Sequence, residues 1–215
     1  MRSLWLTAMT TSGSMKQYNK DLPEQQREQT PEEAHGETKK KQKLTPRAIA
    51  QIGLMVAVIE VSKFALSGLP NIELTSFWLI MFTLYFGWQV VAVVPVFILL
   101  EGAIYGIQLW WIMYLYAWPL LVLIAWLLRK HASALLMAIV SGIFGLCFGA
   151  LCAVPYFFIG LSSGGIANGW TTAVTWWIAG IPWDLIHCGG NFVIMLVLFK
   201  PISFVLKKVG QLHSD

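Results

Sequence analysis

Residues 75–128 read TSFWLIMFTLYFGWQVVAVVPVFILLEGAIYGIQLWWIMYLYAWPLLVLIAWLL, and Glu101 is the only Asp, Glu, Lys or Arg among them. Residues 131–183 contain no Asp, Glu, Lys or Arg at all. A helix of about 20 apolar residues is long enough to cross the hydrocarbon core of a bilayer. These two stretches therefore predict several membrane-spanning helices, as in a polytopic membrane protein.

The composition of the whole chain agrees with this class. Of the 215 residues, 57% are hydrophobic and 12% are charged, whereas a soluble domain has about 45–50% apolar and about 25% charged residues. This bias excludes an ordinary globular enzyme, a disordered protein and a coiled coil. The net charge of +4 does not indicate nucleic-acid binding, because the basic residues lie in an N-terminal tail and at the ends of apolar segments.

The distribution of charge divides the chain into three regions. Residues 1–45 carry eight Lys or Arg and six Asp or Glu. They are predicted to be a disordered cytoplasmic tail, because such a polar segment cannot bury enough apolar surface to offset its ordering entropy. Residues 46–208 are predicted to form the transmembrane domain, and residues 209–215 a cytoplasmic C-terminal tail.

The transmembrane domain is predicted to be all-α, with six transmembrane helices and both termini in the cytoplasm. The six apolar segments run over about 46–69, 76–88, 89–105, 109–128, 132–160 and 181–206. The two short segments in this series are expected to hinge near Gly87. With six spans, every flanking basic cluster lies inside, and the outer loops near 69–75, 105–109 and 161–180 contain no Lys or Arg. The positive-inside rule therefore favours a multi-pass protein of the plasma membrane in this orientation.

The densest group of polar residues lies in the last span, in the run Gly180-Ile-Pro-Trp-Asp184-Leu-Ile-His187-Cys-Gly-Gly-Asn191. Asp184, His187 and Asn191 are spaced i, i+3 and i+7, so they share one helix face. Three interpretations are open: a polar seam between helices, a hydrogen-bonding surface for a polar ligand, and a catalytic or metal-binding pair. No HExxH motif or second His-rich segment supplies further ligands, so we expect no metal site.

Few other ionisable residues lie in or near the apolar segments, where they usually face the bundle interior or a cavity. Glu60 and Lys63 are three residues apart and can share a helix face, so they either form a local ion pair or one of them faces a ligand. Glu101 lies near the outer end of the third span, and Glu73 lies in the loop that follows the first span. Glu101 has either a structural role or a ligand-facing one, and Glu73 is either a solvated loop carboxylate or part of a structured gate.

Small residues recur at four-residue spacing along the fifth span, among them Gly145 and Gly149. Such rows let helix backbones approach closely, so ordinary helix packing is expected there. The three cysteines are an odd number without a CxxC pair, which argues against a disulfide framework.

Together these features resemble the substrate-binding (S) components of energy-coupling factor (ECF) vitamin transporters over about residues 46–206. The resemblance rests on chain size, on six short spans with both ends inside, and on three sequence runs. These runs are Pro46-Arg47-Ala-Ile-Ala-Gln-Ile-Gly53-Leu-Met-Val-Ala57, Leu69-Pro-Asn-Ile-Glu73, and Asp184-Leu-Ile-His187 with Asn191. The chain departs from the family in its long charged tail and in Gly53, where the family often has Ala.

The resemblance implies a subunit that captures a vitamin or vitamin precursor at the outer face and delivers it inward. The implied partners are a transmembrane coupling protein and two ATPase subunits in the same lipid bilayer. The implied lid is the loop with Pro70, Asn71 and Glu73. The implied docking residues on the first helix are Ala48, Gly53 and Ala57. The implied pocket residues are Glu101, Gln108, Trp110, Trp111, Tyr114, Trp183, Asp184, His187 and Asn191.

The chain has no GxxxxGK[ST] motif, so it is not expected to hydrolyse ATP itself. As a substrate-capture subunit it is expected to be neither an enzyme nor a carrier of a cofactor. Outer aromatic residues and carboxylates, with Lys63 as a rare outer cation, favour a neutral or cationic aromatic solute over a strongly anionic one. Two alternatives are an intramembrane enzyme that uses Asp184 and His187, and a membrane scaffold without a ligand.

Overall fold

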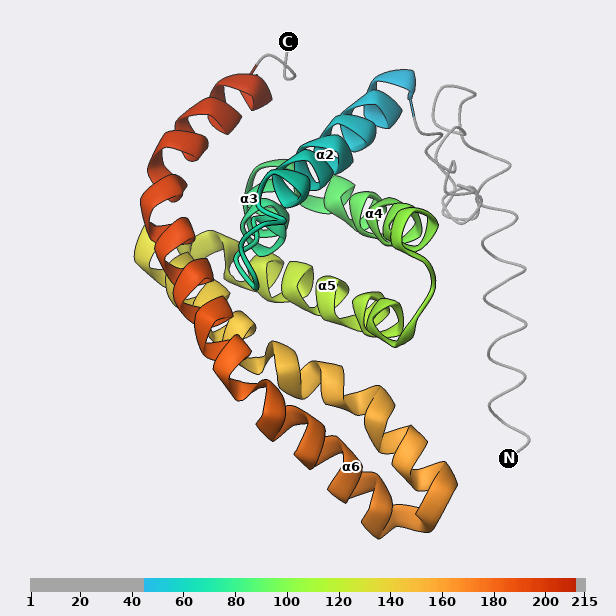
Figure 1. The fold of residues 1–215 in the computed structure, drawn as a ribbon. Helices are drawn as coiled ribbons and strands as arrows, with labels where there is room; N and C mark the ends of the chain where they lie inside the picture. The colour runs from blue at the N-terminus through green and yellow to red at the C-terminus, as the bar shows by residue number, and fades with distance from the viewer. Residues whose placement is uncertain (1–44, 212–215) are drawn as a thin grey trace, which may run out of the picture. The chain divides into compact units, whose positions relative to one another are not determined.

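The computed structural model describes residues 45–211, with side chains over residues 45–209. In chain order its elements are α2 (Pro46–Ala65), α3 (Thr75–Phe86), the 3-10 turn η3 (Gly87–Gln89), α4 (Val90–Tyr105), α5 (Leu109–Leu128), the 3-10 turn η4 (Arg129–His131) and α6 (Ala134–Gln211) (Figure 1). No strand occurs in this part of the chain, so the all-α prediction is confirmed for it. The predicted tail over residues 1–45, apart from Thr45, lies outside the described residues, as do residues 212–215.

Local sequence signals set several helix ends. Thr45 caps α2, because its Oγ1 accepts a hydrogen bond from the Ala48 amide at 3.2 Å, and Pro46 occupies the first helical position. Gly87 ends α3 with a φ of 57°, a conformation that glycine adopts without a steric penalty. The turn η3 follows, and α4 begins at Val90. The hinge predicted near Gly87 is therefore confirmed.

Helix α6 is a hairpin rather than one straight rod. Its backbone leaves helical geometry at Gly164 and Gly165, and Gly165 has a φ of 79°. Residues 134–163 form the first arm and residues 166–211 the second arm, and the two arms lie side by side (Figure 1). At Gly145, an added Cβ would lie 2.9 Å from the backbone carbonyl of His187. The close packing predicted from small residues in the fifth span is therefore confirmed.

The prediction of an outer loop over about 161–180 is wrong in its length. This stretch is helical except at the turn formed by Gly164 and Gly165. Polar side chains at the turn bond within the hairpin and replace the contacts that a loop would make with water. Asn168 Nδ2 donates to Gly160 O at 3.0 Å and to Ser163 Oγ at 2.9 Å. Aromatic rings also join the arms, since Tyr156 stacks on Trp176 with ring centroids 4.5 Å apart. The fifth segment therefore continues past residue 160, and the sixth begins well before residue 181.

Four helical stretches are long and apolar enough to cross a membrane: Pro46–Ala65, Thr75–Tyr105, Leu109–His131 and Ala134–Val209. The last stretch contains both arms of α6, and the second contains α3, η3 and α4. The chain thus has the character of a helical membrane protein. The number of six spans and the cytoplasmic position of both termini stay predictions.

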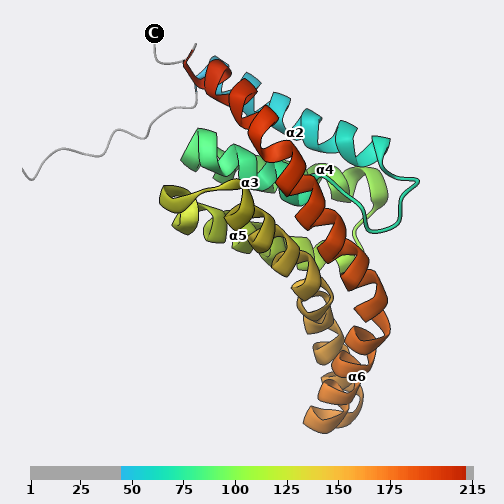
Figure 2. The same cartoon turned by 90° about the vertical axis from the view of Figure 1, so that its left-hand side faces the viewer.

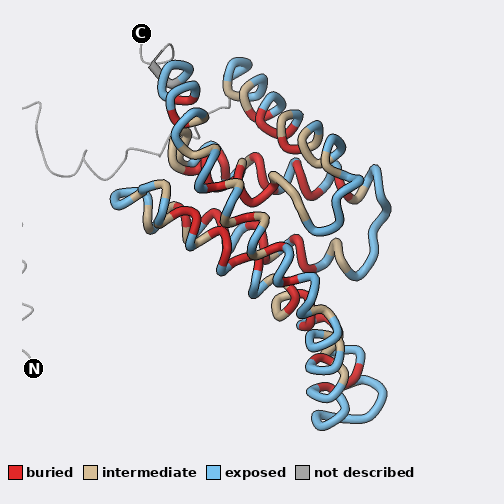
Figure 3. Tube along the Cα trace, turned by 60° about the vertical axis from the view of Figure 1, so that its left-hand side comes forward, coloured by how far each residue is buried: buried red, intermediate tan, exposed pale blue. Residues whose placement is uncertain are grey.

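Helix α3 lies at the centre of the bundle, where it contacts α2, α4, α5 and α6. In Figure 2 the second arm of α6 crosses α3. Buried residues concentrate where the helices meet, and the tip of the α6 hairpin is mostly uncovered (Figure 3). The largest fully buried side chain is that of Trp118 on α5, whose ring packs edge-on against Phe97 and Tyr114. Large apolar side chains such as Leu54 and Phe64 on α2 face outward, as expected for a surface in contact with lipid.

Candidate functional site

A cavity of about 200 Å³ lies beneath the segment that joins α2 to α3. It is lined by residues from this segment, from α2, from α5 and from both arms of α6: Lys63, Leu66, Ser67, Leu69, Asn71, Ile72, Glu73, Tyr114, Phe148 and His187. Ligand sites in proteins combine apolar walls with a few convergent polar groups. This cavity has that combination, and it brings together residues that lie far apart in the sequence.

The joining segment is held in turns of its own backbone. The amide of Leu69 donates to Leu66 O at 2.8 Å, and the amide of Ile72 donates to Leu69 O at 3.3 Å. Asn71 has a φ of 55°, which asparagine tolerates better than most residues. The segment therefore has a defined path over the cavity, in the place where the family resemblance implies a lid.

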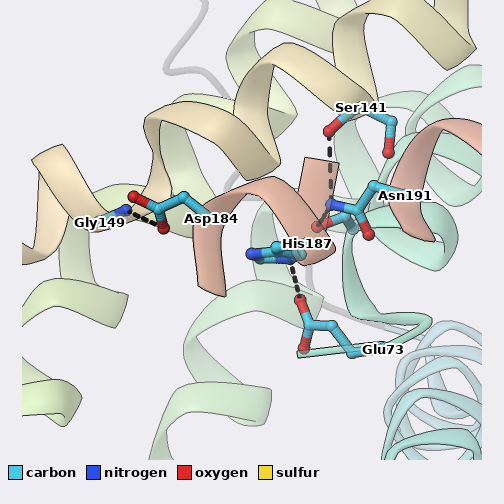
Figure 4. A network of polar contacts seen from close by, with 7 residues as sticks. Glu73, Ser141, Gly149, Asp184, His187 and Asn191 are labelled. Atoms are coloured by element: carbon cyan, nitrogen blue, oxygen red, sulfur yellow. Dashed lines mark hydrogen bonds and ion pairs between the residues drawn. The ribbon is translucent and has the colours of Figure 1, made fainter. Parts of the chain in front are cut away.

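Glu73 connects this segment to α6. Its Oε1 lies 3.4 Å from His187 Nε2 (Figure 4). Both side chains are largely buried. Burial is the largest single influence on the Glu73 carboxyl and would raise its pKa. His187, with smaller contributions from Thr75 and Lys63, acts in the opposite direction, and together they lower the pKa below its usual 4.5. Glu73 is therefore held as a carboxylate at the cavity wall.

Lys63 forms the second charged contact at the cavity. It pairs with Glu101 of α4, whose side chain is fully buried. The Lys63 ammonium also lies 5.6 Å from the centroid of the Tyr114 ring, within the range of a cation–π contact. The salt bridge of Lys63 is therefore with Glu101 and not with Glu60, which lies near enough to both residues to interact with them electrostatically. The fold brings Glu101 to Lys63 because α2 packs against α4.

The polar face of the last span is buried as predicted, but its three members have different contacts (Figure 4). Asp184 Oδ1 accepts a hydrogen bond from the Gly149 amide at 3.0 Å. Asn191 Nδ2 lies 3.3 Å from Ser76 Oγ and 3.3 Å from Ser141 O. Of the three, only His187 lines the cavity. Asp184 and Asn191 thus form a polar seam between helices.

Several other candidate pocket residues lie away from the cavity. Trp183 is 50% exposed on the outside of α6. Gln108 is exposed at the start of α5. Trp111 donates from Nε1 to Ile98 O at 2.7 Å and lines a separate apolar groove between α4 and α5. Trp110 packs edge-on against Tyr114, with ring centroids 5.1 Å apart, so it supports the cavity wall without lining it.

Ser67 and Phe148 were not among the predicted pocket residues, and for Lys63 a ligand-facing position was one of two interpretations. Lys63 carried a signal, because it is a cation within an apolar span, three residues before the joining segment. Phe148 lies among the small residues of the fifth span, and it reaches the cavity because the first arm of α6 packs along the second. Its ring packs edge-on against His187, with centroids 5.0 Å apart.

The candidate docking residues on α2 face away from the bundle. Gly53 and Ala57 are exposed, and Ala48 is partly exposed. A Cβ added at Gly53 would meet no atom within 4 Å. In residues 45–211, no group of three or more His, Cys, Asp or Glu residues is arranged to hold a metal ion. No family model, curated protein or solved structure matches this chain.

Proposed function

We propose that this chain is the substrate-capture subunit of an ECF-type importer, which binds a vitamin or vitamin precursor at the outer face of the plasma membrane. The observation that carries the proposal is the cavity beneath the joining segment, with Lys63, Glu73 and His187 in its wall. Charged side chains inside a membrane protein are costly and usually mark a ligand pathway or site. Here they come from three separate elements and converge on one space.

The chemistry of the cavity indicates a class of substrate. Lys63 is balanced by Glu101, and Glu73 faces His187, so an uncharged or singly charged solute meets no large excess of either sign. Tyr114 and Phe148 provide aromatic surface. The cavity is smaller than the range of about 300–1,000 Å³ typical of sites for drug-sized ligands. A compact heteroaromatic solute fits the proposal better than a large vitamin such as a cobamide.

The proposal includes a topology with six spans and both termini in the cytoplasm. In that topology α3, α4 and each arm of α6 cross separately, and Arg129, Lys200 and Lys207 lie inside. The cavity then lies toward the outer side, because Lys63 is near the end of α2 and Glu73 follows it, whereas α2 begins next to the predicted cytoplasmic tail. The exposed face of α2 is available to a coupling protein.

The alternative of an intramembrane enzyme has less support. It requires Asp184 and His187 to act as a pair, but Asp184 accepts from the Gly149 amide and His187 faces Glu73. A general base must lie within hydrogen-bonding reach of its proton, and Asp184 does not line the cavity.

Co-purification and transport test the proposal. The full chain would be co-expressed with a coupling protein and two ATPase subunits, purified through a tag on this chain, and reconstituted into vesicles. We expect a stable complex and ATP-dependent uptake of a vitamin or precursor, abolished by a substitution in the phosphate-binding loop of the ATPases. A lack of association, under conditions in which another S component binds the same module, would contradict the proposal.

A further inference from the structure

A second cavity, of about 490 Å³, lies where α3, α5 and α6 end. Its walls come from the end of α3, from η4 and the residue after it, and from the last turns of α6: Leu84, Tyr85, Arg129, Ala132, Phe199, Lys200, Ser203, Phe204 and Lys207. The residues of α6 are spaced so that Lys200, Ser203 and Lys207 share one helix face. Three cations thus converge on one space from two elements.

The described residues place no acidic side chain in this cavity. The carboxylates in residues 45–211 are those of Glu60, Glu73, Glu101 and Asp184, and none of them lines it. Glu101 pairs with Lys63, and Glu73 lies beside His187, so neither of these carboxylates neutralises a cation of this cavity. Arg129 lies over the ring of Trp126, with its guanidinium carbon 4.8 Å from the centroid, which fixes its position without neutralising its charge.

Ser203 supplies an independent observation. The residue is 8% exposed, it lines the same cavity, and its buried Oγ has no hydrogen-bond partner among the described residues. A buried hydroxyl without a partner is unfavourable. A ligand with an oxygen acceptor would satisfy it, between the positive charges of Lys200 and Lys207.

The remaining walls are apolar and aromatic, with Leu84, Phe199 and Phe204 beside the cations. A phosphate joined to a hydrocarbon chain matches this combination, because basic pockets between transmembrane helices bind anionic lipid headgroups. We propose that this cavity binds the phosphate headgroup of an anionic phospholipid, with Arg129, Lys200 and Lys207 facing the phosphate and Ser203 donating a hydrogen bond to it.

The test uses the full chain, purified in a neutral detergent and titrated with short-chain phosphatidylglycerol, phosphatidylcholine or inorganic phosphate. Melting temperature reports binding. The chain offers a matched control, because Lys130 and Lys208 are exposed neighbours that do not line the cavity. The double variants Arg129→Gln/Lys200→Gln and Lys130→Gln/Lys208→Gln lose the same charge.

We expect a saturable rise in melting temperature with phosphatidylglycerol and little with phosphatidylcholine. The cavity variant should bind phosphatidylglycerol at least about tenfold more weakly, because two charges next to the phosphate are lost. The control variant should bind as the wild type does. Equal loss in both variants, or an equal response to phosphatidylcholine, would overturn the proposal. If inorganic phosphate alone stabilised the protein as much as phosphatidylglycerol does, the proposal that the ligand is a phospholipid would be overturned.

Ser203→Ala keeps the proposal testable if the double variant does not fold. Without lipid, this substitution removes an unsatisfied hydroxyl, so the melting temperature should be unchanged or higher. With phosphatidylglycerol, the variant should gain less stability than the wild type. An equal gain would show that the hydroxyl does not contact the headgroup and would overturn the proposed geometry.

Discussion

Glu73 Oε1 and His187 Nε2 lie 3.4 Å apart, and this contact joins the segment before α3 to the second arm of α6. The two residues are far apart in the sequence and belong to elements on different sides of the cavity. Opening the cavity through the joining segment would separate them. The contact therefore couples the position of the proposed lid to the charge of the Glu73 carboxylate.

Glu73→Gln should lower the melting temperature at neutral pH, with a loss of about 1–3 kcal/mol in free energy of unfolding, because His187 loses a charged neighbour in a buried site. The folded state lowers the pKa of Glu73 below its usual 4.5. Its stabilising contribution is therefore present above pH 4.5 and is lost as the pH falls through the folded-state value. Thermal unfolding of both proteins across this range checks the prediction, and a difference that grows toward low pH would contradict it.

Lys63→Met should destabilise the protein by about 3–5 kcal/mol, because it leaves the fully buried Glu101 carboxylate without its cation. The double variant Lys63→Met/Glu101→Gln removes both charges and should recover most of this loss. Chemical unfolding of the two variants in the same detergent measures the difference. If the single variant were as stable as the double variant, the pair would not have the role that its burial indicates.

Gly149→Ala should destabilise the α6 hairpin by about 1–3 kcal/mol, because the added Cβ would lie 2.2 Å from Asp184 Oδ2. Gly53→Ala is the matched control, since a Cβ there meets no atom within 4 Å and alanine favours the helix by up to about 1 kcal/mol. Melting temperatures of the two variants should move in opposite directions. A decrease of the same size in both would show that the arms do not approach closely at Gly149.

Ala57→Trp should block association with a coupling protein without a large change in melting temperature. Ala57 is exposed on α2, so a large side chain there adds bulk only to the outer face of the helix. Co-purification with the coupling module measures association, and Phe64→Trp, at a position that is already large and exposed, is the control. Undiminished association of Ala57→Trp would move the docking surface away from this part of α2.

The sequence predicted the parts of the fold that depend on local pattern. The scarcity of charge between Thr75 and Leu128 indicated membrane helices, and Gly87 marked a helix boundary. The spacing of Asp184, His187 and Asn191 indicated a shared buried face. These predictions succeeded because helix periodicity and glycine conformation act within a few residues of the chain.

Contacts between distant segments could not be predicted in the same way. Lys63 pairs with Glu101 because α2 packs against α4, and residue spacing favoured Glu60 instead. The helical course of residues 161–180 depends on contacts between the two arms, such as that of Tyr156 with Trp176. The division of the polar face, with His187 at the cavity and Asp184 at Gly149, is likewise set by packing between the arms.

Ligand binding by the purified full chain tests the central claim most directly. The measurement is the melting temperature in the presence of a panel of vitamins and vitamin precursors, for the wild type, Glu73→Gln in the cavity wall and Trp183→Phe on the exposed face of α6. At a ligand concentration of 100 times Kd, binding stabilises the folded state by about 2.7 kcal/mol. We predict such a shift for at least one compact heteroaromatic compound, retained in Trp183→Phe and reduced in Glu73→Gln. No shift with any compound, or an equal shift in both variants, would contradict a substrate site in this cavity.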